Sequence, residues 1–449
     1  MKQFLFLVSL LVTQFASQSQ ADPGTVQEKL DRYLGSALMA YHFNGVALVA
    51  KGDQVIFHKA YGWRNVQERA QNDTATRFPI LSITKSFTAM LVLRLQELGK
   101  ISLKDKVSKY LDDIPNGDLI SIEQLLTHNS GLYNYTNDIG EEDSALVNHP
   151  VDRNLALQII RKTPVFKPGE DFEYNNSGYY LAGLVIEKAT GKSYEENMRE
   201  LIFLPLQMNR TGQDYTAVPP ALKAIGYQFL DEKQQKPYTY IDSTVSYSAG
   251  DIYSTTGDLF KWTRAIARKE IISPKSWKYA LDRKASDYGI GFRINSFFGH
   301  DYIKHSGGYP GFASEFIYYP KEQVTIILLK NSGNYGQDLW PVTMGMSEIT
   351  LGLPYDDWKK RVPVILPVES LKENEGEYSG GKLKIRFEVK EGQLYMILPG
   401  LELGLSPESA DIFYPENFNL ALRFTRSGDK VDGVILHEHG KDTRLKKGK

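Results

Sequence analysis

Residues 78–89 read Phe-Pro-Ile-Leu-Ser-Ile-Thr-Lys-Ser-Phe-Thr-Ala and contain the tetrapeptide Ser82-Ile83-Thr84-Lys85. Apolar residues recur at helical spacing from Ile83 to Leu98, so this stretch predicts a helix that begins close to the serine. A lysine three residues after a serine lies on the same face of such a helix. A desolvated lysine can take the proton that makes a serine hydroxyl nucleophilic. The tetrapeptide therefore indicates a nucleophile and its base, although a capped helix with a surface lysine has the same pattern.

Two further short motifs carry residues suited to the same chemistry. Tyr174 precedes Asn176 by two residues, and a phenol near a lysine can relay protons while an amide binds substrate or lysine. The tetrapeptide His305-Ser306-Gly307-Gly308 lies shortly before an expected strand, and its glycines would let a substrate approach the backbone. Each motif alone also fits a structural role, as a turn with a packed tyrosine or as a loop that enters a strand.

The two ends of the chain supply strands, and the middle supplies helices. A helix is expected over residues 24–42. Short strands are expected at Gly45–Ala50, Gln54–Ala60, Ser314–Tyr319 and Gln323–Lys330, with turn residues between the members of each pair. Residues 100–290 are mostly helical patterns and long loops. This order predicts one sheet assembled from both chain ends, with the middle as a helical insertion.

A change of pattern marks a second domain. Three prolines, Pro354, Pro363 and Pro367, fall close together, and proline favours extended linkers. Beyond them apolar and polar residues alternate with period two. We therefore expect a main domain over residues 22–352, a linker over 353–372 and a small antiparallel β module over 373–449.

The first residues resemble an export signal. Lys2 precedes the apolar run Phe4–Val12, and small residues lead to Ala21, as in a cleavable signal peptide. Nine apolar residues are too few to cross a bilayer, which takes about 20. We expect a signal peptide over residues 1–21, cleavage near Ala21 and a mature protein that is secreted or periplasmic, without a transmembrane anchor.

Composition excludes several classes of function. The chain has 449 residues, 42% of them hydrophobic, which argues against a disordered protein. It has no cysteine, so a disulfide scaffold, an iron–sulfur site and a cysteine nucleophile are excluded. A net charge of −1 gives no reason to expect nucleic acid or an anionic membrane as a partner. The signature motifs of α/β-hydrolases, zincins and P-loop proteins are absent.

A few other residues are weaker candidates for a functional site. His437 and His439 lie on one face of an expected strand without an evident third metal ligand, so we expect a solvated strand end and no metal site. Tyr133 and Tyr135 could line a cleft, and His128, in the stretch Thr-His-Asn-Ser-Gly, is expected to be structural.

Taken in order, the three motifs S-x-x-K, Y-x-N and basic-Ser-Gly resemble those of the penicillin-recognising serine hydrolases. The resemblance is nearest to the class C β-lactamase-like branch, which also holds D,D-peptidases, D-aminopeptidases and esterases. Phe78–Ala89, Leu125–Leu132 and Ala249–Ser254 match that branch, and the similarity spans residues 24–350. It implies an α/β (α+β) fold: an antiparallel sheet flanked by helices, an all-helical lobe, and an active site between them.

The resemblance also implies roles for single residues. Ser82 would be the nucleophile that forms an acyl-enzyme, and Lys85 would accept or share its proton. Tyr174 would act with Lys85 as general base and return a proton to the leaving group. Asn176 would position the lysine and the substrate amide. No metal and no cofactor would be required.

The third motif would bind substrate. The backbone N–H groups of Ser82 and Gly308 would form the oxyanion hole, with Gly307 and His305 beside it. Many β-lactamases carry lysine where this chain has His305, and an unperturbed histidine is mostly neutral at pH 7. Recognition of a substrate carboxylate, and with it β-lactam hydrolysis, is therefore disfavoured. His305 would instead orient the Tyr174 hydroxyl or contact a substrate carbonyl.

The function expected from these residues is hydrolysis, through an acyl-enzyme, of an amide or ester in a small peptide-like substrate containing a D-amino acid. A carboxylesterase and a β-lactamase are alternatives within the enzyme class. A non-catalytic binding or sensor protein of the same fold is the alternative from another class. The β module could bind a cell-wall partner, cover the cleft or mediate dimers, and the oligomeric state is left open.

Overall fold

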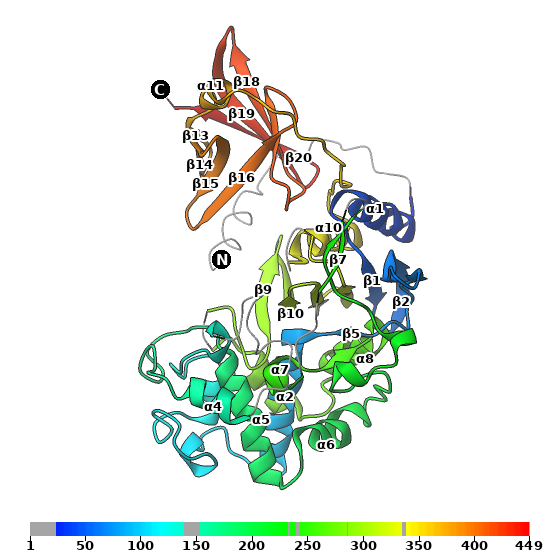
Figure 1. Cartoon of the computed structure of the whole chain (residues 1–449), viewed down its shortest axis with the longest axis vertical. Coiled ribbons are helices and arrows are strands. Elements are labelled where there is room, and N and C mark those ends of the chain that lie inside the picture. Colours follow the sequence, from blue (N-terminus) through cyan, green and yellow to red (C-terminus); the bar gives the residue numbers. More distant parts are fainter. Residues whose placement is uncertain are drawn as a thin grey trace. The chain divides into compact units, whose positions relative to one another are not determined.

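The computed structural model describes residues 24–138, 153–231, 234–238, 243–284, 286–334 and 338–448. The predicted signal peptide lies outside these residues. The chain forms two compact units (Figure 1). One unit comprises Asn44–Ser296 and His300–Leu339, and the other comprises the residues up to Phe43, Phe297–Gly299 and Trp340–Lys449. The second unit thus includes helices that the sequence assigned to the main domain, and the predicted domain limits stay predictions.

The first unit is built on a six-stranded antiparallel sheet in the order β2-β1-β12-β11-β10-β9. Its strands are β1 (Gly45–Lys51), β2 (Gln54–Tyr61), β9 (Arg293–Phe297), β10 (His300–Tyr309), β11 (Phe312–Tyr319) and β12 (Val324–Lys330). β1 pairs with β12, with Gly45 opposite Lys330 and Leu48 opposite Ile327. The first strands of the unit therefore lie beside its last ones, which confirms the prediction of one sheet assembled from distant segments.

Helices fill the sequence between these strands. They are α2 (Thr84–Glu97), α3 (Ile122–Leu126), α4 (Arg153–Ile160), α5 (Asn176–Thr190), α6 (Tyr194–Met198), α7 (Ser243–Gly250), α8 (Thr256–Arg268) and α9 (Pro274–Leu281). Short strand pairs join β3 (Trp63–Asn65) to β4 (Ala70–Gln71), β5 (Phe78–Pro79) to β8 (Tyr253–Ser254), and β6 (Tyr227–Leu230) to β7 (Gln235–Pro237). α8 packs against β1, β11 and β12, whereas α2, α5 and α7 pack against one another in a helical lobe (Figure 1). The predicted fold class is confirmed.

The central helix α2 is buried on nearly every side, which explains why it shows little amphipathic pattern. The Phe87 ring stacks on Trp262 of α8 at 4.0 Å between ring centroids. The Trp262 indole N–H donates to the Ser86 hydroxyl at 3.2 Å. This stack ties the helical lobe to the helix that covers the sheet.

Replacing Phe87 with alanine should therefore lower the free energy of unfolding by about 3–5 kcal/mol, because a fully buried ring leaves a cavity. Urea unfolding would measure the loss. Leu98→Ala is a matched control, since Leu98 is 47% exposed at the end of the same helix and should change stability by less than about 0.5 kcal/mol. Equal losses for the two variants would show that Phe87 does not anchor the core.

The strand β10 was not predicted. His305, Gly307 and Gly308 lie inside β10, not in a loop that precedes a strand. Glycine has a low strand propensity, so the sequence pattern hides this strand. A Cβ atom at Gly307 would lie 2.5 Å from the carbonyl oxygen of Ile80. Glycine is therefore needed where β10 approaches the segment just before Ser82.

The second unit contains α1 (Val26–Ala40), α10 (Trp340–Leu351), α11 (Val368–Lys372) and an eight-stranded closed barrel. The barrel strands are β13 (Gly376–Gly380), β14 (Leu383–Lys390), β15 (Gln393–Leu398), β16 (Leu401–Pro407), β17 (Ile412–Tyr414), β18 (Ala421–Ser427), β19 (Lys430–Glu438) and β20 (Lys441–Lys447). The antiparallel β module is confirmed. Its closure, through pairing of β13 with β20, was not predicted. Phe387 and Phe424 meet inside it, with ring centroids 5.1 Å apart.

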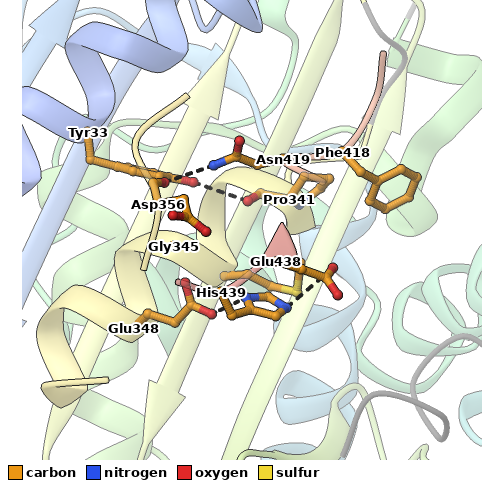
Figure 2. Close-up of a pocket in the computed structure, with 10 residues that line it drawn as sticks. Tyr33, Pro341, Gly345, Glu348, Asp356, Phe418, Asn419, Glu438 and His439 are labelled. Carbon is orange, nitrogen blue, oxygen red and sulfur yellow. Dashed lines mark hydrogen bonds and ion pairs between the residues drawn. The ribbon is translucent and has the colours of Figure 1, made fainter. Parts of the chain in front are cut away.

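The predicted solvated strand end at residues 437–439 is wrong for His439. Its imidazole is largely buried and ion-paired with Glu348 of α10 and, at 3.4 Å, with Glu438 (Figure 2). Burial lowers the pKa of His439, but the two carboxylates outweigh it and raise the pKa to about 10. His437 pairs with Asp442 and Asp356. These histidines are structural ion-pair partners within the second unit.

Two absences among the described residues concern membranes and metals. Within the six ranges that the structure describes, no helix is long and apolar enough to cross a bilayer. The same ranges hold no cluster of three or more histidine and carboxylate side chains placed to bind a metal ion.

Candidate active site

Ser82 lies in a short 3₁₀ turn, Leu81–Ile83, that leads into α2. Leu81 has a φ of +52°, which is strained for a residue with a Cβ. Neighbouring chain segments hold the turn. The Ile80 N–H donates to the Ile252 carbonyl at 2.8 Å, and the Ser314 hydroxyl of β11 donates to the Ile80 carbonyl at 2.7 Å. Ser82 is therefore fixed between the helical lobe and the sheet.

Lys85 lies one turn further along α2, as its spacing predicts. Its ammonium nitrogen lies 2.9 Å from the Ser82 Oγ and 2.8 Å from the carbonyl oxygen of Ala249. The side chain is fully buried, and burial lowers its pKa to about 7. Its Nζ also lies 5.1 Å from the centre of the Tyr174 ring. A lysine with this pKa, touching the serine hydroxyl, can hold or release a proton near neutral pH.

The Ala249 carbonyl reaches Lys85 because α7 is kinked. Tyr247, inside α7, has φ 38° and ψ −136°, well outside helical geometry. Thr88 of α2 donates to the Ser248 carbonyl at 2.7 Å, and the Ser248 hydroxyl donates to the Tyr179 carbonyl of α5 at 2.8 Å. The contact between α2, α5 and α7 thus determines where the lysine nitrogen lies.

Tyr174 lies directly before the N-terminus of α5, where Asn175 is the N-cap and its side chain accepts the Ser177 N–H at 2.7 Å. Burial raises the pKa of Tyr174 to about 12, although a hydrogen bond with Ser82 and the charge of Arg293 lower it in part. At neutral pH the phenol is therefore protonated and contacts the serine. It is placed to pass a proton, not to begin as a phenolate.

Among the described residues, Asn176 contacts Thr136 and Asn134, and not Lys85, which was its expected partner. Its amide nitrogen donates to the Thr136 hydroxyl at 2.9 Å, and its backbone N–H donates to the Asn134 side chain at 3.2 Å. Lys85 is not among the hydrogen-bond partners of Asn176 in the described structure, and the Ala249 carbonyl supplies the contact expected of it. A role for Asn176 in holding substrate stays a prediction.

His305 is 2% exposed and its two ring nitrogens have different partners. Nδ1 lies 2.8 Å from the Ser306 carbonyl, which can only accept, so Nδ1 carries the proton. Nε2 lies 3.0 Å from the Tyr288 hydroxyl and must accept from it. Burial, followed by the charge of Lys85, holds the pKa of His305 well below its usual value. The proposed contact of His305 with the Tyr174 hydroxyl is thus replaced by one with Tyr288.

The predicted oxyanion donors lie where two segments meet. β10 packs against the turn that holds Ser82, and Gly307 makes its close contact with Ile80 there. Gly308 follows it in β10, opposite Ala313 of β11, and is exposed. The structure therefore brings Ser82 and Gly308 to one locality. That their N–H groups bind an oxyanion stays a prediction.

Sequence reasoning missed Arg293 and Tyr288. The guanidinium carbon of Arg293 lies 5.9 Å from the centre of the Tyr174 ring and 5.7 Å from that of Tyr288. Arg293 also pairs with Asp287 at 2.7 Å. It adds a permanent cation beside Tyr174. An isolated arginine in a strand carries no local signal, so only the fold could reveal it.

His128 packs beside Tyr174 and binds the N-cap residue of α5. Its Nδ1 accepts the Asn175 N–H at 3.0 Å, and its ring lies 4.3 Å from the Tyr174 ring. Burial, and next the charge of Lys85, holds its pKa well below the usual value. Of the two tyrosines expected to line a cleft, Tyr135 is buried and donates to the Val245 carbonyl, while Tyr133 donates to Asp138.

Known proteins share the region that carries these motifs. The family model described as Beta-lactamase matches residues 26–340. The chain belongs to the beta-lactamase family. Among curated members, a penicillin-binding protein of Bacillus subtilis (strain 168) is 28% identical over 435 residues, which cover 90% of this chain and 94% of that protein.

Solved structures of relatives show the same fold. The penicillin-binding protein from Bacillus halodurans is 28% identical, with a TM-score of 0.64, over 71% of this chain and 99% of that one. An octameric penicillin-binding protein homologue from Pyrococcus abyssi is 26% identical, with a TM-score of 0.66, over 93% of this chain and 99% of that one. Membership of the beta-lactamase family thus rests on the region that holds Ser82, Lys85, Tyr174 and His305.

Proposed function

We propose that this protein is a serine hydrolase in which Ser82 forms an acyl-enzyme with a small peptide-like amide or ester. The observation that carries the proposal is the buried Lys85, whose nitrogen lies 2.9 Å from the Ser82 oxygen. A merely structural lysine would have no reason to be desolvated beside a serine hydroxyl. Similarity to penicillin-binding proteins supports the same chemistry.

The reaction would proceed by two acyl transfers. Neutral Lys85 takes the Ser82 proton as Oγ attacks the substrate carbonyl, and the Ser82 and Gly308 N–H groups stabilise the oxyanion. The proton passes through Tyr174 to the leaving group. Water then attacks the ester carbonyl with the same groups in reverse order, and Ser82 regains its proton.

Between the two candidate bases, the structure favours Lys85. A base that operates near neutral pH needs a pKa near 7, which Lys85 has, whereas the pKa of Tyr174 is about 12. Tyr174 then acts as the proton donor to the leaving group. The two groups are close enough for their titrations to be coupled, so kinetics would report them as a pair.

Arg293 is the residue that bears on which substrates the site would bind. Neutral His305 cannot replace a cationic lysine, but the Arg293 guanidinium places a positive charge near Tyr174 instead. We propose that it attracts the carboxylate of a peptide substrate that ends in a D-amino acid. A carboxylesterase is the second candidate, because the neutral third motif suits a substrate without a carboxylate.

Arg293→Met should raise KM for a peptide with a free C-terminal carboxylate about tenfold or more, because a charge-assisted contact is lost. For a p-nitrophenyl ester, KM should change less than about threefold. Arg268→Met is a control, since Arg268 is half exposed and pairs with the surface residue Asp53. Equal effects of Arg293→Met on both substrates would exclude carboxylate binding and favour the esterase.

The test of the function is a substrate panel. Turnover of D-alanyl-D-alanine peptides, p-nitrophenyl esters and a penicillin would be compared under the same conditions. Preference for the D-peptide supports the proposal, and preference for the ester selects the second candidate. No turnover and no covalent adduct with any of the three would leave a binding protein. We further propose that the protein acts outside the cytoplasm, on the strength of the signal-like residues 1–21.

A further inference from the structure

Tyr288 is a buried residue that contacts several groups of the site but takes no part in the proposed mechanism. It is fully buried at the start of the stretch Tyr288-Gly289-Ile290-Gly291, between α9 and β9. A Cβ at Gly291 would lie 2.6 Å from the Ala89 Cβ and 3.2 Å from the Lys85 carbonyl. The segment therefore packs directly on the catalytic helix α2, and glycine is required for that approach.

The hydroxyl of Tyr288 has a defined direction. It lies 3.0 Å from Nε2 of His305. Because the proton of His305 is on Nδ1, where it is donated to the Ser306 carbonyl, Nε2 has only a lone pair to offer. The Tyr288 O–H must therefore donate. Both ring nitrogens of His305 are then engaged within the protein, and neither presents an N–H to substrate.

The ring of Tyr288 is also held in place. It lies 4.6 Å from the His128 ring and 6.1 Å from the Tyr174 ring, measured between centroids. Its plane is nearly perpendicular to that of His305. Tyr288 thus connects the third motif to the catalytic tyrosine through a single packed aromatic group.

We infer that Tyr288 is a positioning residue that fixes His305 as the neutral Nδ1–H tautomer and turns its Nε2 away from substrate. This inference deepens the proposed function and rests on it for its kinetic consequence. It explains how a histidine can stand where many β-lactamases carry lysine without becoming a cation. It also explains why recognition of a substrate carboxylate would depend on Arg293 and not on His305.

Several charged or titratable groups act on His305. Lys85 of α2, Arg293 of β9 and Lys304 of β10 all oppose a proton on its ring, and burial does so more strongly. His128 lies in the same buried cluster and is also neutral. A donor at Nε2 adds to these effects, because a nitrogen that accepts a hydrogen bond cannot at the same time carry a proton.

The inference is tested with Tyr288→Phe, which removes only the hydroxyl. Tyr135→Phe is the matched control, because Tyr135 is equally buried in the same unit but donates to the Val245 carbonyl. Long-range ¹H–¹⁵N spectra of histidine-labelled protein would report the tautomer, with His305 assigned through His305→Gln. Wild type and Tyr135→Phe should show His305 with its proton on Nδ1. Tyr288→Phe should show a mixture of tautomers or partial protonation.

Kinetics provide the second readout. Tyr288→Phe should lower kcat about fivefold to tenfold at pH 8, as expected for a lost hydrogen bond, and the loss should deepen as the pH falls. Tyr135→Phe should show no such pH dependence. An unchanged tautomer with an unchanged pH profile in Tyr288→Phe would overturn the inference, as would an Nε2–H tautomer in wild type. The spectra require no turnover, so failure of the proposed function would be seen separately.

Discussion

Ser82→Ala should abolish hydrolysis, with kcat/KM falling by at least about 10⁴-fold for every substrate that the wild type accepts. The reason is that Ser82 Oγ is the atom that would carry the acyl group, and its Lys85 partner at 2.9 Å would have nothing to deprotonate. Initial rates with a p-nitrophenyl ester would measure the loss. Labelling by a fluorophosphonate should disappear in parallel.

The control for this variant is Ser108→Ala. Ser108 is exposed in the same unit and lies outside the three motifs. It should keep full activity and full labelling. Retention of more than about 1% of wild-type activity by Ser82→Ala, with label still attached, would show that another residue is the nucleophile.

Lys85→Met should lower kcat/KM by about 10³–10⁴-fold, because removing a positioned base costs this much in many enzymes. In the wild type, kcat/KM should rise with pH around a midpoint near 7, since the pKa of Lys85 is about 7 and only the neutral amine can accept a proton. This limb of the pH profile should be absent from the residual activity of Lys85→Met.

The Lys85→Met variant should lose activity without losing stability of the folded state. The folded pKa of Lys85 is about 7, whereas an unfolded lysine titrates near 10.5. Between these values the unfolded chain binds more protons, so this group makes the native state less stable as the pH falls from 10.5 to 7. Lys85→Met removes that penalty and should not lower the melting temperature at pH 7.

Lys330→Met is a matched control. Lys330 is equally buried in β12, burial lowers its pKa to about 7, and its nitrogen donates to the Asn334 carbonyl. Because it lies outside the three motifs, its loss should leave kcat/KM within about threefold of wild type. A similar collapse of activity in both lysine variants would point to general disruption and not to a base.

The sequence was most informative where chemistry is encoded locally. Ser82 and Lys85 lie on one helical turn, and the order of this motif with Tyr174 and His305 along the chain is specific enough to indicate the fold. Apolar alternation after residue 372 indicated an antiparallel module, which the structure shows as a barrel. Each motif, and the alternation itself, is recognised from residues within a few positions of one another.

Contacts between distant segments could not be predicted in the same way. Lys85 meets the Ala249 carbonyl, and His305 meets Tyr288, only because of how α7 and the loop before β9 pack. The strand that holds His305 could not be recognised from the sequence pattern. Its glycines allow a close approach to Ile80 but have a low strand propensity. The barrel residue His439 was misread for the same reason, since its partner Glu348 lies on α10.

The central claim is that Ser82 becomes acylated, and intact mass after mixing the protein with a penicillin tests it most directly. An acid quench followed by mass spectrometry should show one added penicilloyl group, and peptide mapping should place it on Ser82. Ser82→Ala should show no added mass. If the wild type stays unmodified by penicillin and by a p-nitrophenyl ester under rapid quenching, or is modified at another residue, then Ser82 is not the nucleophile and the proposed mechanism is wrong.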